Sequence, residues 1–71
     1  MTGDDIKAWR KRLGLTQSEA AANLGITLRG CQKREAGDAT IVRETELACR
    51  YLAEHPEAIE GQAAEAGGNA G

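Results

Sequence analysis

The stretch Thr16–Gly37, TQSEAAANLGITLRGCQKREAG, decides the fold of this chain. Thr16 is followed three residues later by Glu19, which is the Ser/Thr-x-x-Glu pattern of a capping box at a helix start. Gly25 then interrupts the helical pattern, and glycine tolerates the positive φ that a sharp turn requires. Thr27 is placed to cap a second helix. The stretch therefore predicts two short helices joined by a tight turn.

The second of these helices carries Arg29, Lys33 and Arg34, and we expect it to end at Gly37, a residue that suits a C-terminal cap. A helix, a short glycine turn and a basic second helix make up a helix-turn-helix, the commonest way for a small protein to enter the major groove of DNA. Residues 16–37 therefore indicate DNA binding from their local pattern.

Another helix is predicted ahead of this motif. Thr2 can cap it, and we expect it to run to about Leu13. Ile6, Trp9 and Leu13 recur at i, i+3 and i+7, so they form one apolar stripe on that helix. Trp9 is accordingly expected to pack in the core.

A fourth helix is predicted to begin near residues 41–43. It should end at His55, because Pro56 disfavours helical geometry in the residue before it. Its apolar residues at helical spacing are Leu47, Ala48, Tyr51 and Leu52. From residue 61 the sequence GQAAEAGGNAG has nothing to bury and predicts a disordered Gly/Ala-rich tail, residues 61–71, after a domain of residues 1–60.

Length and composition agree with a small helical domain. The 71 residues allow one domain at most, and the chain has no Phe, one Trp, one Tyr and one Pro. Ala, Leu, Glu, Arg and Lys are frequent, which favours an all-α fold. No apolar run approaches the roughly 18 residues that a membrane helix needs.

The two cysteines, Cys31 and Cys49, are 18 residues apart and form no Cys-x-x-Cys pair. With no secretory signal apparent, they are interpreted as reduced core thiols of a cytoplasmic protein. A disulfide between them is the alternative. No nucleophile beside a base, no pair of carboxylates and no cluster of metal ligands appears, so we expect no enzymatic activity, no cofactor and no metal.

The net charge of −2 at first argues against nucleic acid as a partner. However, the chain up to Arg50 holds nine basic and seven acidic residues, while four glutamates follow it. Partner choice depends on the local patch more than on the total charge. The basic excess is modest, so we expect weak non-specific DNA binding at physiological salt.

From Ile6 to Leu52 the sequence resembles the lambda-repressor-like helix-turn-helix family, which includes small phage repressors and Cro proteins. The resemblance is strongest in LGLTQSEAAANLGIT, residues 13–27, and in the Glu35-Ala36-Gly37 ending. It implies a compact all-α domain of four to five helices that binds DNA, with a recognition helix of about residues 27–36.

Base contacts are expected from the N-terminal part and the exposed face of that recognition helix. Positions i, i+1, i+4 and i+5 share one side of a helix. Arg and Lys can donate to guanine, Gln can pair with adenine, and Leu can contact a thymine methyl group. The predicted base-contact residues are Thr27, Leu28, Arg29, Gln32 and Lys33.

Three further residues are expected at the phosphate backbone. The resemblance assigns a phosphate contact to Gln17, in the first turn of its helix, where N–H groups favour anions. It makes Arg43, which follows the motif loop, a second candidate. It also pairs Arg10 with Glu35 in a partly buried ion pair that fixes the recognition helix, with Arg10 near the phosphates as well.

Three positions leave alternatives open. Leu28 either faces DNA or is partly buried against the preceding helix. Gly30, which costs about 1 kcal/mol relative to Ala inside a helix, either permits a close approach or is simply tolerated. Arg34 stands where the family usually has an apolar residue, so it forms a salt bridge, lays its stem on apolar surface or reaches a phosphate.

The sequence thus predicts a sequence-specific DNA-binding transcriptional regulator of bacterial or phage type, a repressor or autoregulator. Such proteins usually bind as symmetric homodimers to inverted-repeat operators in double-stranded DNA. The candidate dimer residues are Tyr51, Leu52 and Ile59, with a place in the core as the equal alternative for Leu52. The alternative is an antitoxin-type protein that binds a toxin as well as its operator, with its acidic end, residues 54–65, meeting a basic partner.

Overall fold

The computed structural model describes residues 1–60, which form four α-helices and a single 3-10 turn and contain no strand. The all-α prediction is confirmed. The tail predicted at residues 61–71 lies outside the described residues. The helices and the turn are α1 (Gly3–Arg12), α2 (Gln17–Leu24), α3 (Leu28–Ala36), α4 (Arg43–Glu54) and η1 (Pro56–Ala58).

Local capping interactions begin α2 and end α2 and α3 where the sequence predicts. Thr16 and Glu19 form a complete capping box: the Glu19 N–H donates to Thr16 Oγ1 over 3.1 Å, and the Thr16 N–H donates to Glu19 Oε1 over 2.9 Å. Gly25 has φ +72° and Gly37 has φ +84°, in the left-handed region that favours glycine. The two-helix interpretation of residues 16–37 is therefore confirmed.

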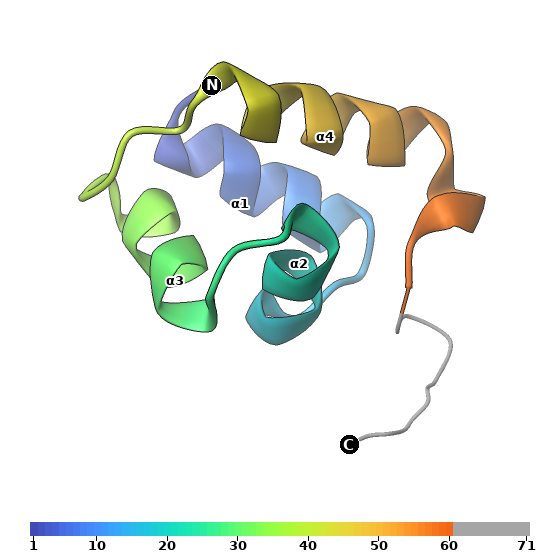
Figure 1. Cartoon of the computed structure of the whole chain (residues 1–71), viewed down its shortest axis with the longest axis horizontal. Coiled ribbons are helices and arrows are strands. Elements are labelled where there is room, and N and C mark those ends of the chain that lie inside the picture. The colour runs from blue at the N-terminus through green and yellow to red at the C-terminus, as the bar shows by residue number, and fades with distance from the viewer. Residues whose placement is uncertain (61–71) are drawn as a thin grey trace.

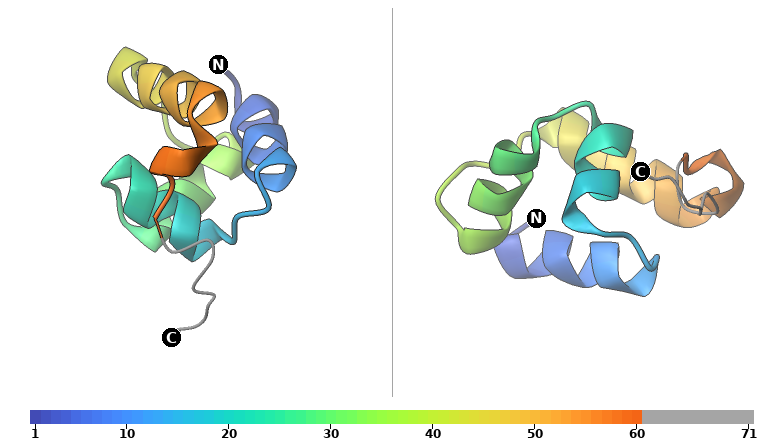
Figure 2. Two further views of the ribbon diagram at one scale, coloured as in Figure 1. Left: turned by 90° about the vertical axis from the view of Figure 1, so that its right-hand side faces the viewer. Right: turned by 90° about the horizontal axis from the view of Figure 1, so that it is seen from below.

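Figure 1 shows how the four helices are arranged, with α4 along the top, α1 beside it, and α2 and α3 below. The side view in Figure 2 shows the same neighbourhood of α1 and α4. Contacts join α3 to both α1 and α2, and α4 to both α1 and α2. The helix-turn-helix is thus supported from behind by two helices outside the motif.

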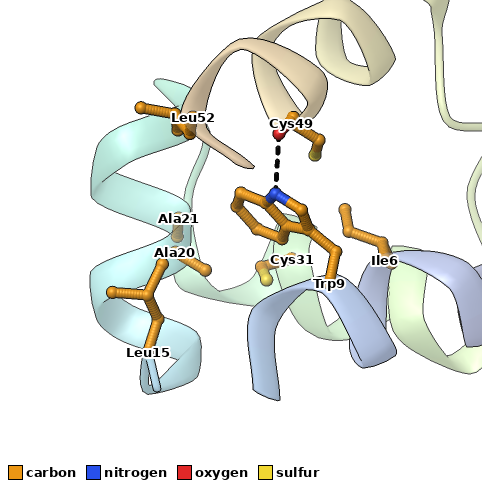
Figure 3. Packing of buried hydrophobic residues seen from close by; sticks show 8 residues of the cluster. All are labelled: Ile6, Trp9, Leu15, Ala20, Ala21, Cys31, Cys49 and Leu52. Carbon is orange, nitrogen blue, oxygen red and sulfur yellow. Dashed lines mark hydrogen bonds between the residues drawn. The ribbon is translucent and has the colours of Figure 1, made fainter. Parts of the chain in front are cut away.

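The core is small and contains little aromatic material. Trp9 lies at its centre and donates from Nε1 to the backbone carbonyl oxygen of Cys49 over 2.7 Å, which satisfies the indole N–H in a buried position (Figure 3). This bond also ties α1 to α4. The buried apolar residues are Ile6, Trp9, Leu15, Ala20, Ala21, Cys31, Cys49 and Leu52.

The orientation of α4 differs from the predicted apolar face. Leu47 and Tyr51 are 43% and 55% exposed, whereas Thr45, Cys49 and Leu52 are buried at i, i+4 and i+7. Thr45 and Cys49, two small residues, lie on the buried face of α4. A prediction based on the large apolar residues alone therefore placed that face on the wrong side of the helix. Leu52 is consequently a core residue, and its candidacy as a dimer contact is wrong.

After α4 the chain turns back onto α2. Asn23 on α2 donates from Nδ2 to the Glu60 carbonyl oxygen, and the Glu60 N–H donates to Asn23 Oδ1, each over 2.8 Å. Ile59 is half-buried against the core. The Asn23 side chain and η1 therefore hold the C-terminal part of the described chain against the rest of the domain.

The N-terminus of α1 approaches the C-terminal end of α3 closely at Gly3. A Cβ atom built on Gly3 would lie 2.5 Å from the carbonyl oxygen of Arg34 and 2.7 Å from that of Glu35. Both neighbours are backbone atoms of a helix, so they cannot rotate away. The absence of a side chain at residue 3 therefore sets how closely α1 and α3 pack.

We expect Gly3→Ala to lower the free energy of unfolding by about 1–3 kcal/mol, the usual cost of overpacking, because the new methyl group must push α1 away from α3. Thermal and urea denaturation followed by helical circular dichroism measure this. Gly30→Ala is the comparison, since its Cβ would meet only side-chain atoms of Arg34 and Thr27 and it gains helix propensity. Equal or greater stability of Gly3→Ala would contradict the packing argument.

Candidate nucleic-acid interface

The predicted base-contact residues lie together on the outer side of α3. Leu28, Arg29, Gln32 and Lys33 are all exposed, and Leu28 is 43% exposed instead of buried against α2. Thr27 caps the helix, its Oγ1 accepting from the Gly30 N–H over 2.9 Å, and its side chain stays exposed. The structure thus presents one continuous polar and basic face along α3.

Behind this face, Arg10 of α1 holds Glu35 of α3. The Arg10 guanidinium donates from Nε to Glu35 Oε2 over 2.7 Å and from Nη2 to Glu35 Oε1 over 3.2 Å. Arg10 Nη1 also donates to the Leu15 carbonyl oxygen over 3.0 Å. The two side chains are only 13% and 6% exposed, so this bidentate ion pair is largely removed from water.

Glu35 also receives donors from two other elements. Gln17 Nε2, at the start of α2, donates to Glu35 Oε1 over 3.2 Å, and the Cys31 thiol donates to Glu35 Oε2 at 3.7 Å. Burial by itself raises the pKa of Glu35, but the hydrogen bonds from Arg10 and Gln17 outweigh it and hold that pKa below its ordinary value. Glu35 is therefore a carboxylate that joins α1, α2 and α3.

A weaker contact extends this network to the exposed face. Gln32 Nε2 lies 3.5 Å from Gln17 Oε1, within reach of a hydrogen bond. Because Gln17 donates to Glu35 from Nε2, its oxygen is directed toward Gln32. The structure thereby brings a predicted phosphate residue, a predicted base residue and the ion pair into one connected group.

The Arg34 side chain excludes one of its three alternatives, the salt bridge, within the described residues. Its Nη1 donates to the Gly30 carbonyl oxygen over 2.9 Å, so the side chain lies back along its own helix, over Gly30. The space at Gly30 is filled by this guanidinium and not by a neighbouring helix. Within the described residues, Arg34 Nε is buried without a hydrogen-bond partner and forms no salt bridge.

Arg43 is placed apart from this group. It is the first residue of α4 and is exposed. No hydrogen bond among residues 1–60 connects its side chain to Gln17, Gln32 or Glu35. Its position after the motif loop is as predicted, and its contact with DNA stays a prediction.

The structure adds Lys7 and Lys11 of α1, which the sequence interpretation left out. Both are exposed, and together with Gln17 and Gln32 they line a groove whose inner side is the Arg10–Glu35 pair. Their i, i+4 spacing, with an arginine between them, was the available signal.

The two cysteines are buried in the core. Cys31 and Cys49 are free thiols and fully buried. Burial raises the pKa of Cys49 to about 11 and also raises that of Cys31, so both stay protonated. In the part of the chain that the structure describes, no group of His, Cys, Asp or Glu side chains could hold a metal ion. Within the same residues, no helix is long and apolar enough to cross a membrane.

We expect Glu35→Ala to lower the free energy of unfolding at neutral pH by about 3–5 kcal/mol, because it leaves the buried Arg10 without its partner. Denaturant titration measures the loss. The ionised Glu35 carboxylate contributes fully to the free energy of unfolding above its ordinary pKa of 4.5. That contribution is lost as the pH falls through the lower pKa of Glu35 in the folded state. The difference in the free energy of unfolding between the wild type and Glu35→Ala should therefore become smaller as the pH is lowered.

Glu54→Ala, which removes an exposed carboxylate near the end of α4, is the matched control and should change stability by less than about 0.5 kcal/mol. A Glu35→Ala protein as stable as this control would show that the ion pair contributes nothing. A pH-independent difference would show that packing, and not the charge, accounts for the loss.

Comparison with known proteins agrees with this geometry. Residues 6–47, more than half of the chain, match the family model described as helix-turn-helix. The matched span includes α1 from Ile6 onward, the whole motif and the first part of α4. Comparison with curated proteins and with solved structures finds no match. The chain belongs to the Cro/C1-type helix-turn-helix family of DNA-binding domains.

Proposed function

We propose that this protein is a sequence-specific transcriptional regulator of bacterial or phage type, a repressor or autoregulator that acts in the cytoplasm. The observation that carries the proposal is the exposed face of α3, which is polar and basic and is held at its inner side by the buried Arg10–Glu35 pair. A recognition surface must keep its side chains in register with base edges, and a helix anchored in this way can do so.

The residues of α3 differ in what they read. Arg29 and Lys33 donate to guanine O6 and N7, and each good base contact discriminates by about 1–3 kcal/mol. Gln32 pairs with adenine, with Gln17 behind it holding the amide in place. Thr27 and Leu28, at the N-terminal end of the helix, contact bases directly, Leu28 through a thymine methyl group.

Phosphate contacts position α3 in the groove. Gln17 reaches the backbone from the first turn of α2, where N–H groups favour anions, and Arg43 reaches it from the first turn of α4. Arg10 has its guanidinium donors directed to Glu35 and Leu15, so we assign it to holding α3, with any phosphate contact left to the outer hydrogens of its two Nη groups.

One domain of this size buries too little DNA surface to be highly specific alone, so we propose that it binds an inverted repeat as a homodimer, with half-sites about one helical turn apart. Exposed apolar residues on α4, Leu47 and Tyr51, support a protein contact there, with Ile59 nearby in the chain. In the antitoxin alternative, this surface of α4 would contact the toxin instead of a second copy of the chain. A chain that is monomeric in solution would favour that alternative.

We expect Arg29→Ala and Lys33→Ala each to abolish the specific gel shift with DNA from upstream of the chain's own reading frame. Each removes a donor to guanine edges without touching the core. The helical circular dichroism spectrum should not change, because both side chains are exposed.

Arg50→Ala is the matched control for that experiment, since it removes one positive charge from α4, and it should leave the specific shift in place. Normal operator binding by both α3 variants would mean that this face of α3 does not read bases.

We expect the double variant Leu47→Ala/Tyr51→Ala to shift the protein from dimer to monomer in analytical ultracentrifugation. It should weaken binding to a two-half-site duplex by more than tenfold while leaving binding to a single half-site unchanged. Leu28→Ala is the control, because Leu28 is an equally exposed leucine on α3 and its loss should not change the dimer. A dimer that survives the α4 variant would place the interface elsewhere.

A further inference from the structure

The groove between α1 and α3 continues the proposed DNA-binding surface beyond the helix-turn-helix. Lys7 and Lys11 of α1, Gln17 of α2 and Gln32 of α3 all line it. Figure 2, seen from below, shows α1, α2 and α3 converging on this side of the domain. Gln17, a predicted phosphate contact, therefore shares this groove with the two lysines of α1.

The charge in this groove is positive despite the acidic total of the chain. Arg10 and Glu35, on the inner side, neutralise one another through their bidentate pair. Among residues 1–60 neither Lys7 nor Lys11 takes part in an ion pair, and both are exposed. Two uncompensated ammonium groups therefore set the local field, which is what attracts a phosphate backbone.

The spacing of the two lysines suits a polyanion better than a single anion. Residues i and i+4 are separated by about 6 Å along a helix, since each residue rises about 1.5 Å. Their flexible stems can adjust each ammonium group independently as a point charge. Two neighbouring phosphates of one strand can thus be bound at once.

We propose that Lys7 and Lys11 bind adjacent phosphates of one DNA strand, extending the interface from α3 across α2 to α1. This inference rests on the proposed function and adds a backbone contact surface to it. These two residues contribute affinity and salt dependence but no sequence preference, because phosphates are the same at every base pair.

The test compares Lys7→Gln/Lys11→Gln with Arg12→Gln/Arg50→Gln. The second pair removes the same two charges from the groove between α1 and α4, so the net charge of the two variants is identical. Binding to a duplex from upstream of the chain's own reading frame, and to a shuffled duplex of equal length, is measured by fluorescence anisotropy between about 50 and 200 mM salt.

For the lysine variant we expect the slope of log K against log salt to become shallower by about 1.8, which corresponds to two lost phosphate contacts. Affinity should fall by the same factor on both duplexes, and Lys7→Arg/Lys11→Arg should restore it. The arginine control should keep the wild-type slope.

Equal slopes for the lysine and arginine variants would overturn the inference, as would a lysine variant that loses affinity for the upstream duplex alone. A wild-type chain that binds neither duplex would instead overturn the proposed function. Melting curves of both variants confirm that the fold is intact.

Discussion

The Glu35 carboxylate is the point at which the three helices of the DNA-binding half meet. It accepts two hydrogen bonds from Arg10 on α1, one from Gln17 on α2 and one from the Cys31 thiol on its own helix. A carboxylate this far removed from water is costly unless its lone pairs are filled, and here each oxygen has two donors. The orientation of α3 therefore depends on this one side chain.

This dependence is stronger because the apolar core is small. Trp9 is the only aromatic residue in it, and alanines and cysteines occupy positions that larger side chains fill in bigger domains. Ala20 and Ala21 let α2 approach closely, and Gly3 does the same for α1 against α3. Close backbone contact and a few directed polar bonds, such as that from Trp9 to Cys49, take the place of a large buried volume.

An acidic chain can still present a basic surface. The four glutamates after Arg50 outweigh the net charge of −2, so the chain up to Arg50 is net positive. Arg29 and Lys33 lie on the outer face of α3, and Lys7 and Lys11 lie on α1. Glu35, which lines the groove between α1 and α3, is neutralised by Arg10, and Asp38 is the acidic residue that lies beside Arg29 and Lys33. Local charge, and not the total, is what a DNA strand approaching this side would meet.

The sequence by itself determined the helices and their ends, because capping boxes and positive-φ glycines are local chemistry that a few neighbouring residues specify. Thr16 with Glu19, Gly25 and Gly37 were sufficient for the motif. The exposure of residues 29, 32 and 33 also followed from helical periodicity, whereas only the structure decided that Leu28 is exposed.

Only the tertiary structure decided which face of α4 is buried, how Arg34 lies over Gly30, and that Asn23 clamps the backbone of Glu60. Each of these depends on how helices distant in sequence rotate against one another, and no local pattern encodes that rotation. The same reason explains why Lys7 and Lys11 were passed over: their groove exists only once α1 is packed beside α3.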